Sequence, residues 1–129
     1  MSDHVVLELI KQADKAITAE DFDALMAFYA DDAVLVVQPG QIARGKPQIR
    51  QAFEAIAKHF KNALTVTQGE AHAIEGAGTV LVVMETLLFV RGTQSPIKRR
   101  ATHVFKGDCD NGWLCTVDNS YGTELLDAT

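Results

Sequence analysis

The stretch YADDAVLVVQPG, residues 29–40, marks the point where the chain changes from helical to extended spacing. It opens with an aromatic residue and two adjacent acids, continues as an apolar run over residues 33–37, and ends at Pro39-Gly40. A short apolar run closed by a Pro-Gly pair is typical of a buried strand that ends in a turn. The elements on either side of this predicted strand decide the fold class.

Helical spacing dominates the residues around this strand. Apolar residues recur every three or four positions over residues 5–17, which predicts an amphipathic helix. A capping pattern at residues 18–21 predicts the start of a second helix, with Tyr29 on its apolar face. GKPQIRQAFEAIAKHF, residues 45–60, predicts a third helix, because Pro47 suits its first turn.

Extended segments fill the rest of the chain. Residues 64–76, 78–92, 96–107 and 112–123 predict four strands, and the separators between them are short. Short separators favour an antiparallel meander. Helices followed by strands indicate an α+β fold with the helices packed on one face of the sheet. We expect residues 1–129 to form one domain.

The composition excludes several classes of function. There are 12 basic and 17 acidic residues, a formal net charge of −5, and the one basic run, residues 98–100, lies in a predicted strand. This disfavours nucleic-acid binding. No apolar window would span a membrane, and the N-terminus does not resemble a signal peptide. We expect a cytoplasmic protein in which Cys109 and Cys115 are free thiols.

Motifs for bound groups are also missing from the sequence. The histidines are scattered, and no spacing of His, Cys, Asp and Glu suggests a metal site. The segment GEAHAIEGAG, residues 69–78, lacks the strand-to-helix context that a phosphate-binding loop needs. We therefore expect no metal and no cofactor.

The predicted strand within residues 79–90 is apolar at both odd and even positions. A strand with one solvent-exposed face should alternate between apolar and polar residues. The helices would cover one face of this strand, and a second subunit is the simplest cover for the other. The pattern predicts a homodimer.

Two segments carry a family resemblance: DFDALMAFYADDAV at residues 21–34 and RGKPQIRQAF at residues 44–53, followed by a meander whose last strand opens with Gly112-Trp113. Their order resembles the NTF2-like superfamily, in particular its ketosteroid-isomerase-like and SnoaL-like small proteins, and is also similar to the calcium/calmodulin kinase association domain. The resemblance implies a cystatin-like cone, with a curved antiparallel sheet around three N-terminal helices and a pocket at the open end. It also implies dimerisation through the outer sheet face.

The resemblance also allows the ketosteroid isomerase mechanism to be tested on this sequence. It would place the proton-shuttling carboxylate at Val37 or Gln38, the oxyanion tyrosine at Ala13 and the oxyanion aspartic acid at Thr102. None of these residues can perform the role that its position requires. Steroid isomerisation by that route is therefore excluded.

Pairing the predicted strands around their turns yields two polar rows. Thr102 falls opposite Asn119 and His103 opposite Asp118, and a hairpin turning at residues 93–95 sets Thr86 beside Thr102. The rows on the two faces are then Thr86, Thr102 and Asn119 on one, and Glu85, His103 and Asp118 on the other.

The resemblance favours the threonine row as the one that faces the cavity. The row with His103 would then lie on the outer face, as a charge cluster at a dimer interface. If the register differs by one residue the assignment reverses. His103 and Asp118 with Glu85 would then form a general base near neutral pH, similar to SnoaL-like cyclases, which use an Asp and a His from the sheet.

The prediction is an NTF2-like protein that binds a small, partly apolar ligand and lacks the ketosteroid isomerase groups. One alternative is a cofactor-independent isomerase, dehydratase or cyclase that uses His103 and Asp118, or Tyr29 with Arg100. A second alternative is an oligomerisation module. The expected ligand pocket comprises Tyr29, Gln38, Phe53, Met84, Thr86, Arg100, Thr102, Asn119 and Tyr121.

Overall fold

The computed structural model describes residues 4–108 and 112–127. The elements run in the order α1 (Val5–Ala19), α2 (Phe22–Met26), β1 (Tyr29–Gln38), β2 (Gln41–Arg44), α3 (Gly45–His59), β3 (Leu64–Gly76), β4 (Thr79–Val90), β5 (Ile97–Asp108), β6 (Gly112–Asn119) and the 3₁₀ helix η1 (Thr123–Asp127). The α+β class and the sequence of helices and strands are as expected. The strand β2 and the helix η1 were not expected.

Helix α1 is longer than its apolar pattern suggests. His4 caps its start by accepting a hydrogen bond from the Val6 N–H, and Glu20 ends it in the left-handed conformation at φ 58°. Thr18 therefore lies inside α1, where its hydroxyl accepts from the Val66 N–H of β3 at 3.1 Å. The short helix α2 is capped by Asp21 instead.

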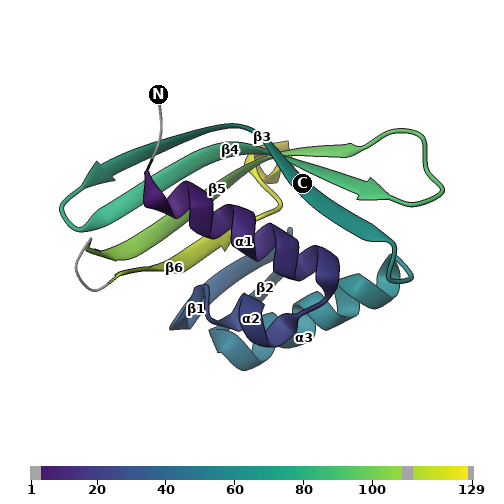
Figure 1. The fold of residues 1–129 in the computed structure, drawn as a ribbon, viewed down its shortest axis with the longest axis horizontal. Coiled ribbons are helices and arrows are strands. Elements are labelled where there is room, and N and C mark those ends of the chain that lie inside the picture. Colours follow the sequence, from purple (N-terminus) through teal and green to yellow (C-terminus); the bar gives the residue numbers. More distant parts are fainter. Residues whose placement is uncertain (1–3, 109–111, 128–129) are drawn as a thin grey trace.

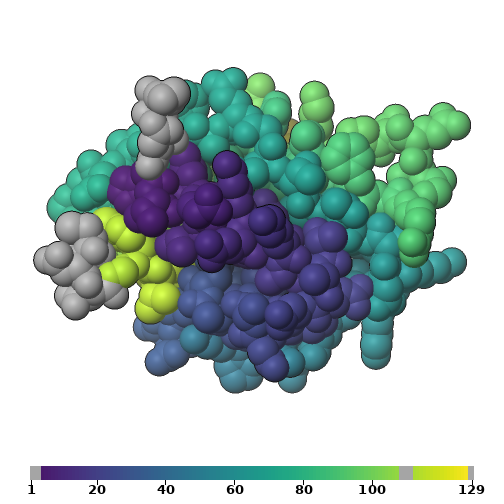
Figure 2. Space-filling model, in the orientation of Figure 1, coloured from purple at the N-terminus to yellow at the C-terminus, as the bar shows by residue number. Residues whose placement is uncertain are grey.

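The six strands form one sheet in the order β2-β1-β6-β5-β4-β3. The meander from β3 to β6 is antiparallel as expected, and β1 joins it through a parallel pairing with β6. Figure 1 shows the helices on one side of this curved sheet, where α1 contacts β3 and α3 contacts β1. In the space-filling view the side chains of α1 and α2 cover the middle of that side (Figure 2).

The register between β4 and β5 decides which side chains face the helices. Thr102 pairs with Val83, whereas the sequence analysis set it beside Thr86. This displacement is three residues, an odd number, so every residue of β5 faces the opposite way from the prediction. Ala101, His103 and Phe105 point inward and are buried.

The pairing of β5 with β6 follows the prediction near the site. Thr102 lies opposite Asn119, and His103 lies opposite Asp118. A bulge then shifts the register between Val104 and Phe105. A bulge adds one residue to one strand, and it allows Trp113, Cys115 and Asp118 all to be buried.

Candidate functional site

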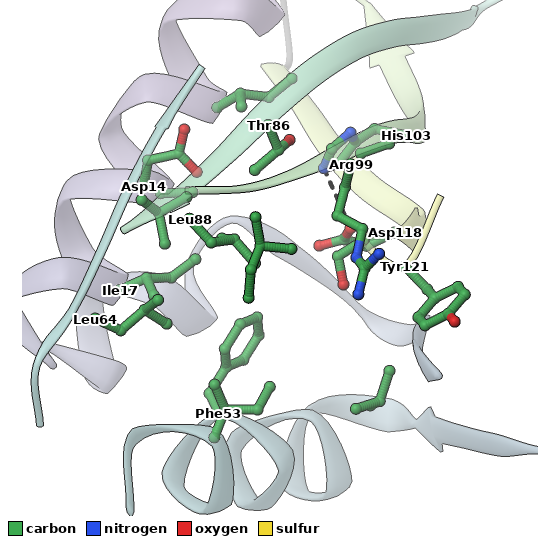
Figure 3. A pocket seen from close by; sticks show the side chains of 18 of the residues that line it. Asp14, Ile17, Phe53, Leu64, Thr86, Leu88, Arg99, His103, Asp118 and Tyr121 are labelled. Atoms are coloured by element: carbon green, nitrogen blue, oxygen red, sulfur yellow. Dashed lines mark ion pairs between the residues drawn. The ribbon is translucent and has the colours of Figure 1, made fainter. Parts of the chain in front are cut away.

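A cavity of about 370 Å³ lies between the helices and the inner face of the sheet. Helix α1 contributes Ile10, Ala13, Asp14 and Ile17, and helix α3 contributes Phe53, Ile56 and His59. Figure 3 shows Phe53 on α3 and Leu64, Thr86 and Leu88 on the strands, around the same space. Most of the lining is apolar, which suits the hydrocarbon part of a small molecule.

Four of the titratable side chains that line this cavity come from four different elements and are central to the site. Asp14 lies on α1, Tyr29 starts β1, His103 lies on β5 and Asp118 on β6. Tyr29, Asp118 and His103 are 1%, 4% and 7% exposed. In Figure 3, Asp14 stands on one side of the pocket and His103 with Asp118 on the other.

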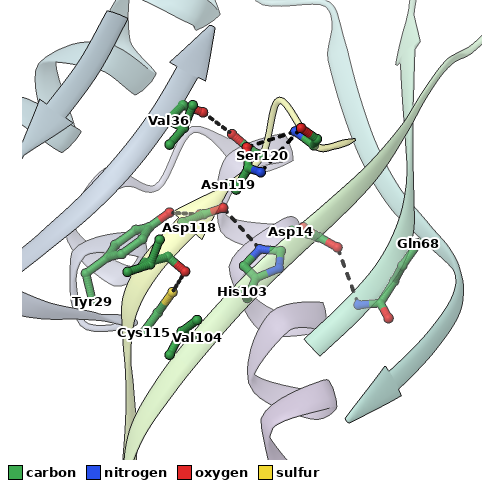
Figure 4. Close-up of polar contacts among 12 residues, drawn as sticks. Asp14, Tyr29, Val36, Gln68, His103, Val104, Cys115, Asp118, Asn119 and Ser120 are labelled. Atoms are coloured by element: carbon green, nitrogen blue, oxygen red, sulfur yellow. Dashed lines mark hydrogen bonds and ion pairs between the residues drawn. The ribbon is translucent and has the colours of Figure 1, made fainter. Parts of the chain in front are cut away.

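The side chains of Tyr29, Asp118 and His103 form a buried chain (Figure 4). The Tyr29 hydroxyl donates to Asp118 Oδ2 at 2.6 Å. His103 Nε2 lies 3.1 Å from Asp118 Oδ1, an ion-pair distance, but no donor among the described residues is aligned to hydrogen-bond this oxygen. The Nδ1 atom of His103 is likewise buried without a hydrogen-bond partner in that part of the chain. Burial and the nearby Asp118 carboxylate raise the pKa of Tyr29 well above 10, so its hydroxyl remains a donor.

The charge of His103 depends on its carboxylate neighbours. Burial by itself lowers the pKa of the imidazole, but the attraction of Asp118 and Asp14 outweighs it, and the pKa lies above 6.5. The imidazolium form is therefore stabilised near neutral pH. A protonated imidazole donates from both ring nitrogens.

Asp14 is the carboxylate whose protonation is most altered. The pKa of Asp14 is raised from 3.8 to about 7. Burial is the largest cause, and it outweighs the attraction of His103 and the hydrogen bond from Gln68, which both lower the pKa. The Gln68 amide donates to Asp14 Oδ2 at 3.5 Å, a long contact. A carboxylate in this state exchanges protons near neutral pH, as a general base must.

The rim of the cavity carries a positive charge. Arg99 lines the cavity, its guanidinium lies 4.7 Å from the centre of the Tyr121 ring, and Glu124 of η1 pairs with it at 3.1 Å. Tyr121 is held in place by a turn in which the Gly122 N–H donates to Asn119 Oδ1 at 2.9 Å. Gly122 has φ +93°, and a Cβ atom there would lie 2.6 Å from the Arg100 carbonyl oxygen. The turn therefore requires glycine.

Of the nine residues predicted to line the pocket, the structure places five around the cavity: Tyr29, Gln38, Phe53, Thr86 and Tyr121. Met84 is buried in the core instead. Arg100 is exposed, and Thr102 and Asn119 are half-buried and lie side by side on the other face of the sheet.

The predicted orientation of the histidine row was wrong. His103 and Asp118 line the cavity, whereas the sequence analysis placed them on the outer face. The prediction took Thr102 as the cavity-facing residue from the resemblance and paired it with Thr86; in the structure Thr102 pairs with Val83, so His103 faces the cavity in its place. Glu85 does not join them: it is half-buried, pairs across the strands with Arg100 and does not line the cavity.

Among the cavity residues that the prediction missed, Asp14 and Arg99 are the two that carry a formal charge on a carboxylate or a guanidinium. Asp14 follows Ile10 by four positions and precedes Ile17 by three, so it lies in the apolar stripe of α1. An acid within an apolar stripe is a signal that could have been used. Arg99 was missed for the same reason as His103, because both are odd-numbered residues of β5 and the odd-numbered residues face the cavity.

The described residues contain no group of three or more His, Cys, Asp or Glu side chains that could hold a metal ion. Among the helices described, none is long and apolar enough to cross a membrane.

Comparison with solved structures identifies the class of fold. Aln2 from a Streptomyces species matches with 15% identity, 95% of this chain and 91% of that chain covered, and a TM-score of 0.79. A protein of unknown function with a cystatin-like fold from Nostoc punctiforme matches with 18% identity, coverage of 88% and 85%, and a TM-score of 0.76. An NTF2-like protein of unknown function from Pseudomonas putida matches with 16% identity, coverage of 88% and 81%, and a TM-score of 0.76. These similarities confirm the NTF2-like, cystatin-like cone and say nothing about activity.

The family follows from the sequence itself. Residues 6–115 match the model of the SnoaL-like domain, and the chain belongs to that family. Among curated proteins, none matches this sequence.

Proposed function

We propose that this protein binds a small, largely apolar carbonyl compound in its cavity and catalyses a proton transfer on it without a cofactor. The observation that carries the proposal is the convergence of Asp14, His103 and Asp118 on a cavity that is otherwise mostly apolar. Apolar walls hold the hydrocarbon part of a ligand, and a few polar groups orient it. The corresponding reaction is an isomerisation, a dehydration or a cyclisation.

The protonation states of these groups support acid–base chemistry. A carboxyl group with a pKa of about 7 and an imidazole with a raised pKa give a proton acceptor and a proton donor at the same pH. Titratable pairs with strongly perturbed pKa values in a cleft are typical of active sites. The proton donor would be His103, which pairs with Asp118, and Tyr29 in turn donates a hydrogen bond to Asp118.

The outer face of the sheet supports a homodimer as part of the same proposal. Leu81, Val83 and Val117 are 39%, 39% and 40% exposed there. Leu81 pairs with Val104, and Val104 with Val117, so these side chains form a continuous apolar row. An apolar row of this kind on a sheet is typical of a surface that a second subunit covers. Sedimentation velocity would test it: a dimer is expected, a monomer would contradict it, and a larger assembly would favour an oligomerisation module.

A reducing, cytoplasmic location is supported by the state of Cys115. Its thiol is free and buried, and burial raises its pKa well above 9, whereas Cys109, the other predicted free thiol, lies outside the described residues. A buried, protonated thiol in an apolar setting is a structural residue that does not react. Fractionation of the host cell would test the location, and recovery outside the cytoplasm would contradict it.

Binding and proton transfer can be measured with a single probe. 2-Tetralone is a small, mostly apolar ketone with acidic hydrogens next to its carbonyl group. We expect it to raise the melting temperature and to exchange these hydrogens with solvent deuterium faster in the presence of the protein. No thermal shift and no acceleration, with 2-tetralone or with related aryl ketones, would refute the proposed function.

A further inference from the structure

We infer that Asp14 of helix α1 is the group that removes the proton, and that His103 donates to the oxygen on which charge develops. The substrate class is then a carbonyl compound with a C–H bond next to the carbonyl carbon. This inference rests on the proposed function and assigns its roles. It places the base on a helix, on the opposite side of the cavity from the strand residues that the sequence analysis considered.

The surroundings of Asp14 fit the role of a base. The side chain is half-buried, lines the cavity and has Ile10, Ala13 and Ile17 of the same helix around it. Its one hydrogen bond among the described residues is the 3.5 Å contact from Gln68 to Oδ2. The other carboxylate oxygen is therefore free to approach a C–H bond. Weak hydrogen bonding leaves a carboxylate basic, whereas several strong donors would hold it ionised and inert.

Asp118 does not fit that role, although it lies in the same cavity. It is 4% exposed, accepts a 2.6 Å hydrogen bond from Tyr29 and lies 3.1 Å from His103. These contacts fix the orientation of Asp118 and direct it toward His103 and Tyr29. Asp118 is therefore a positioning residue that keeps His103 protonated.

His103 fits the role of the donor. Its Nε2 atom approaches Asp118 without a hydrogen bond to Oδ1. The Nε2–H is therefore not bonded to Oδ1, and it is the donor that we assign to an oxygen atom of a bound molecule. A donor aimed at a developing oxyanion in a water-poor cavity is among the strongest contributions to catalysis.

The proposed step balances without any further reactant. The Asp14 carboxylate takes the proton as the C–H bond breaks, and the electron pair of that bond forms a C=C bond. The carbonyl π electrons move to oxygen, which accepts a hydrogen bond or a proton from His103 Nε2. If Asp14 trades this proton for a solvent deuteron and then delivers it to the same carbon, the result is isotope exchange; delivery to another carbon gives an isomer.

The charged and titratable groups that face the pair set its pH dependence. They come from every wall of the cavity: Tyr29 on β1, Asp118 on β6, Arg99 on β5 and His59 on α3, with the neutral amide of Gln68 on β3 beside Asp14. The activity should rise with pH through about 7 as Asp14 ionises, and should fall again at higher pH as His103 loses its proton.

The test is Asp14→Asn, with Glu8→Gln as the matched control. Glu8 is an exposed carboxylate on the same helix. We expect Asp14→Asn to bind 2-tetralone within about threefold of the wild type but to lose at least about 100-fold of the catalysed deuterium exchange. Glu8→Gln should retain both. Exchange by Asp14→Asn at the wild-type rate, with loss in Asp118→Asn or His103→Gln, would overturn the inference and leave the proposed function intact.

A second measurement decides the inference without turnover. Carbon NMR of the labelled Asp14 carboxyl group should show titration at about pH 7, and His103→Gln should move that titration to higher pH, because His103 lowers the pKa of Asp14. Titration of Asp14 near its ordinary value would overturn the inference, whatever the exchange assay gives. If the wild type neither binds nor exchanges any ketone while Asp14 titrates as expected, the proposed substrate class fails and the assignment of Asp14 as the proton acceptor fails with it.

Discussion

The substitution Asp14→Asn should stabilise the protein at alkaline pH and have little effect at acid pH. In the folded state the pKa of Asp14 lies at about 7, above its ordinary value of 3.8. Between these two values the folded state retains a proton that the unfolded state has released. Stability must therefore fall as the pH rises through this window and level off above it. Asparagine resembles the neutral carboxylic acid in shape and does not ionise.

The size of the effect follows from the width of that window. A shift from 3.8 to about 7, at about 1.4 kcal/mol per pH unit, corresponds to at most about 4 kcal/mol. Because Asp14 is only half-buried, solvent screens part of this cost, and we expect about 2–4 kcal/mol. The attraction of His103 is already contained in this figure, because it is one of the effects that lower the pKa of Asp14.

Urea unfolding of the wild type and Asp14→Asn at several pH values between about 4 and about 8 would measure this difference. The free energy of unfolding of the variant should exceed that of the wild type by an amount that grows with pH and then becomes constant. Glu8→Gln, which changes an exposed carboxylate on the same helix, should show no such growth. A difference that does not change with pH, or that favours the wild type above about pH 7, would refute the assignment of a raised pKa to Asp14.

Three further substitutions test other parts of the structure. Tyr29→Phe removes the 2.6 Å hydrogen bond to Asp118 and should lower the free energy of unfolding by about 1.5–3 kcal/mol, measured with urea at neutral pH; an unchanged value would mean that the contact is not made. Gly122→Ala would bring a Cβ atom within 2.6 Å of the Arg100 carbonyl oxygen at φ +93°, and should lower the free energy of unfolding in urea by at least about 1–3 kcal/mol. Gly40→Ala should cost less, because a Cβ atom at that position would meet none of the described residues beyond its chain neighbours within 4 Å. Leu81→Glu places a charge in the apolar row of the outer face and should convert the proposed dimer to a monomer in sedimentation velocity. The control Glu70→Gln, at an exposed residue of β3, should leave the dimer intact. A Leu81→Glu variant that sediments as a dimer would place the interface elsewhere.

The order of the elements could be predicted from the sequence because each element carries its own periodicity. The apolar stripes of α1 and α3 and the turn at Pro39-Gly40 are local signals, and they match the observed helices and the end of β1. The pairing of β1 with β6 joins residues more than eighty positions apart, and the parallel arrangement leaves no local mark in the sequence. The strand β2 has four residues, too few for a periodicity to appear.

The composition of the site could not be predicted in the same way. Each strand of the meander was assigned correctly, but the site depends on which face of each strand turns inward. That choice depends on the register of the β4–β5 hairpin, whose connection spans residues 91–96 and contains glycine, serine and proline positions that suit more than one turn. The prediction paired Thr102 with Thr86 in place of Val83 and, from the resemblance, turned Thr102 toward the cavity, which placed His103 and Asp118 outside it.

The energetic cost of Asp14 bears on the question of function more directly than the fold does. Asp14 makes one long hydrogen bond within the described part of the chain, and a polar residue so weakly bonded in an apolar stripe lowers stability at neutral pH. Leucine or alanine at this position would continue the stripe of Ile10, Ala13 and Ile17. A chain selected for stability or assembly alone would gain from such a replacement, whereas an active site commonly keeps a destabilising group because its activity needs it. The cone places this carboxylate across the cavity from His103, which pairs with the buried Asp118, and Asp118 is itself held by Tyr29. The ketosteroid isomerase positions at Val37 and Gln38 have no acid, and the carboxylate that lines the cavity on α1 is the one to which we assign the role of proton acceptor. The presence of Asp14 at a cost in stability is the result expected of a residue that acts on a ligand, and it is the reason to prefer the acid–base role over a passive binding or assembly role.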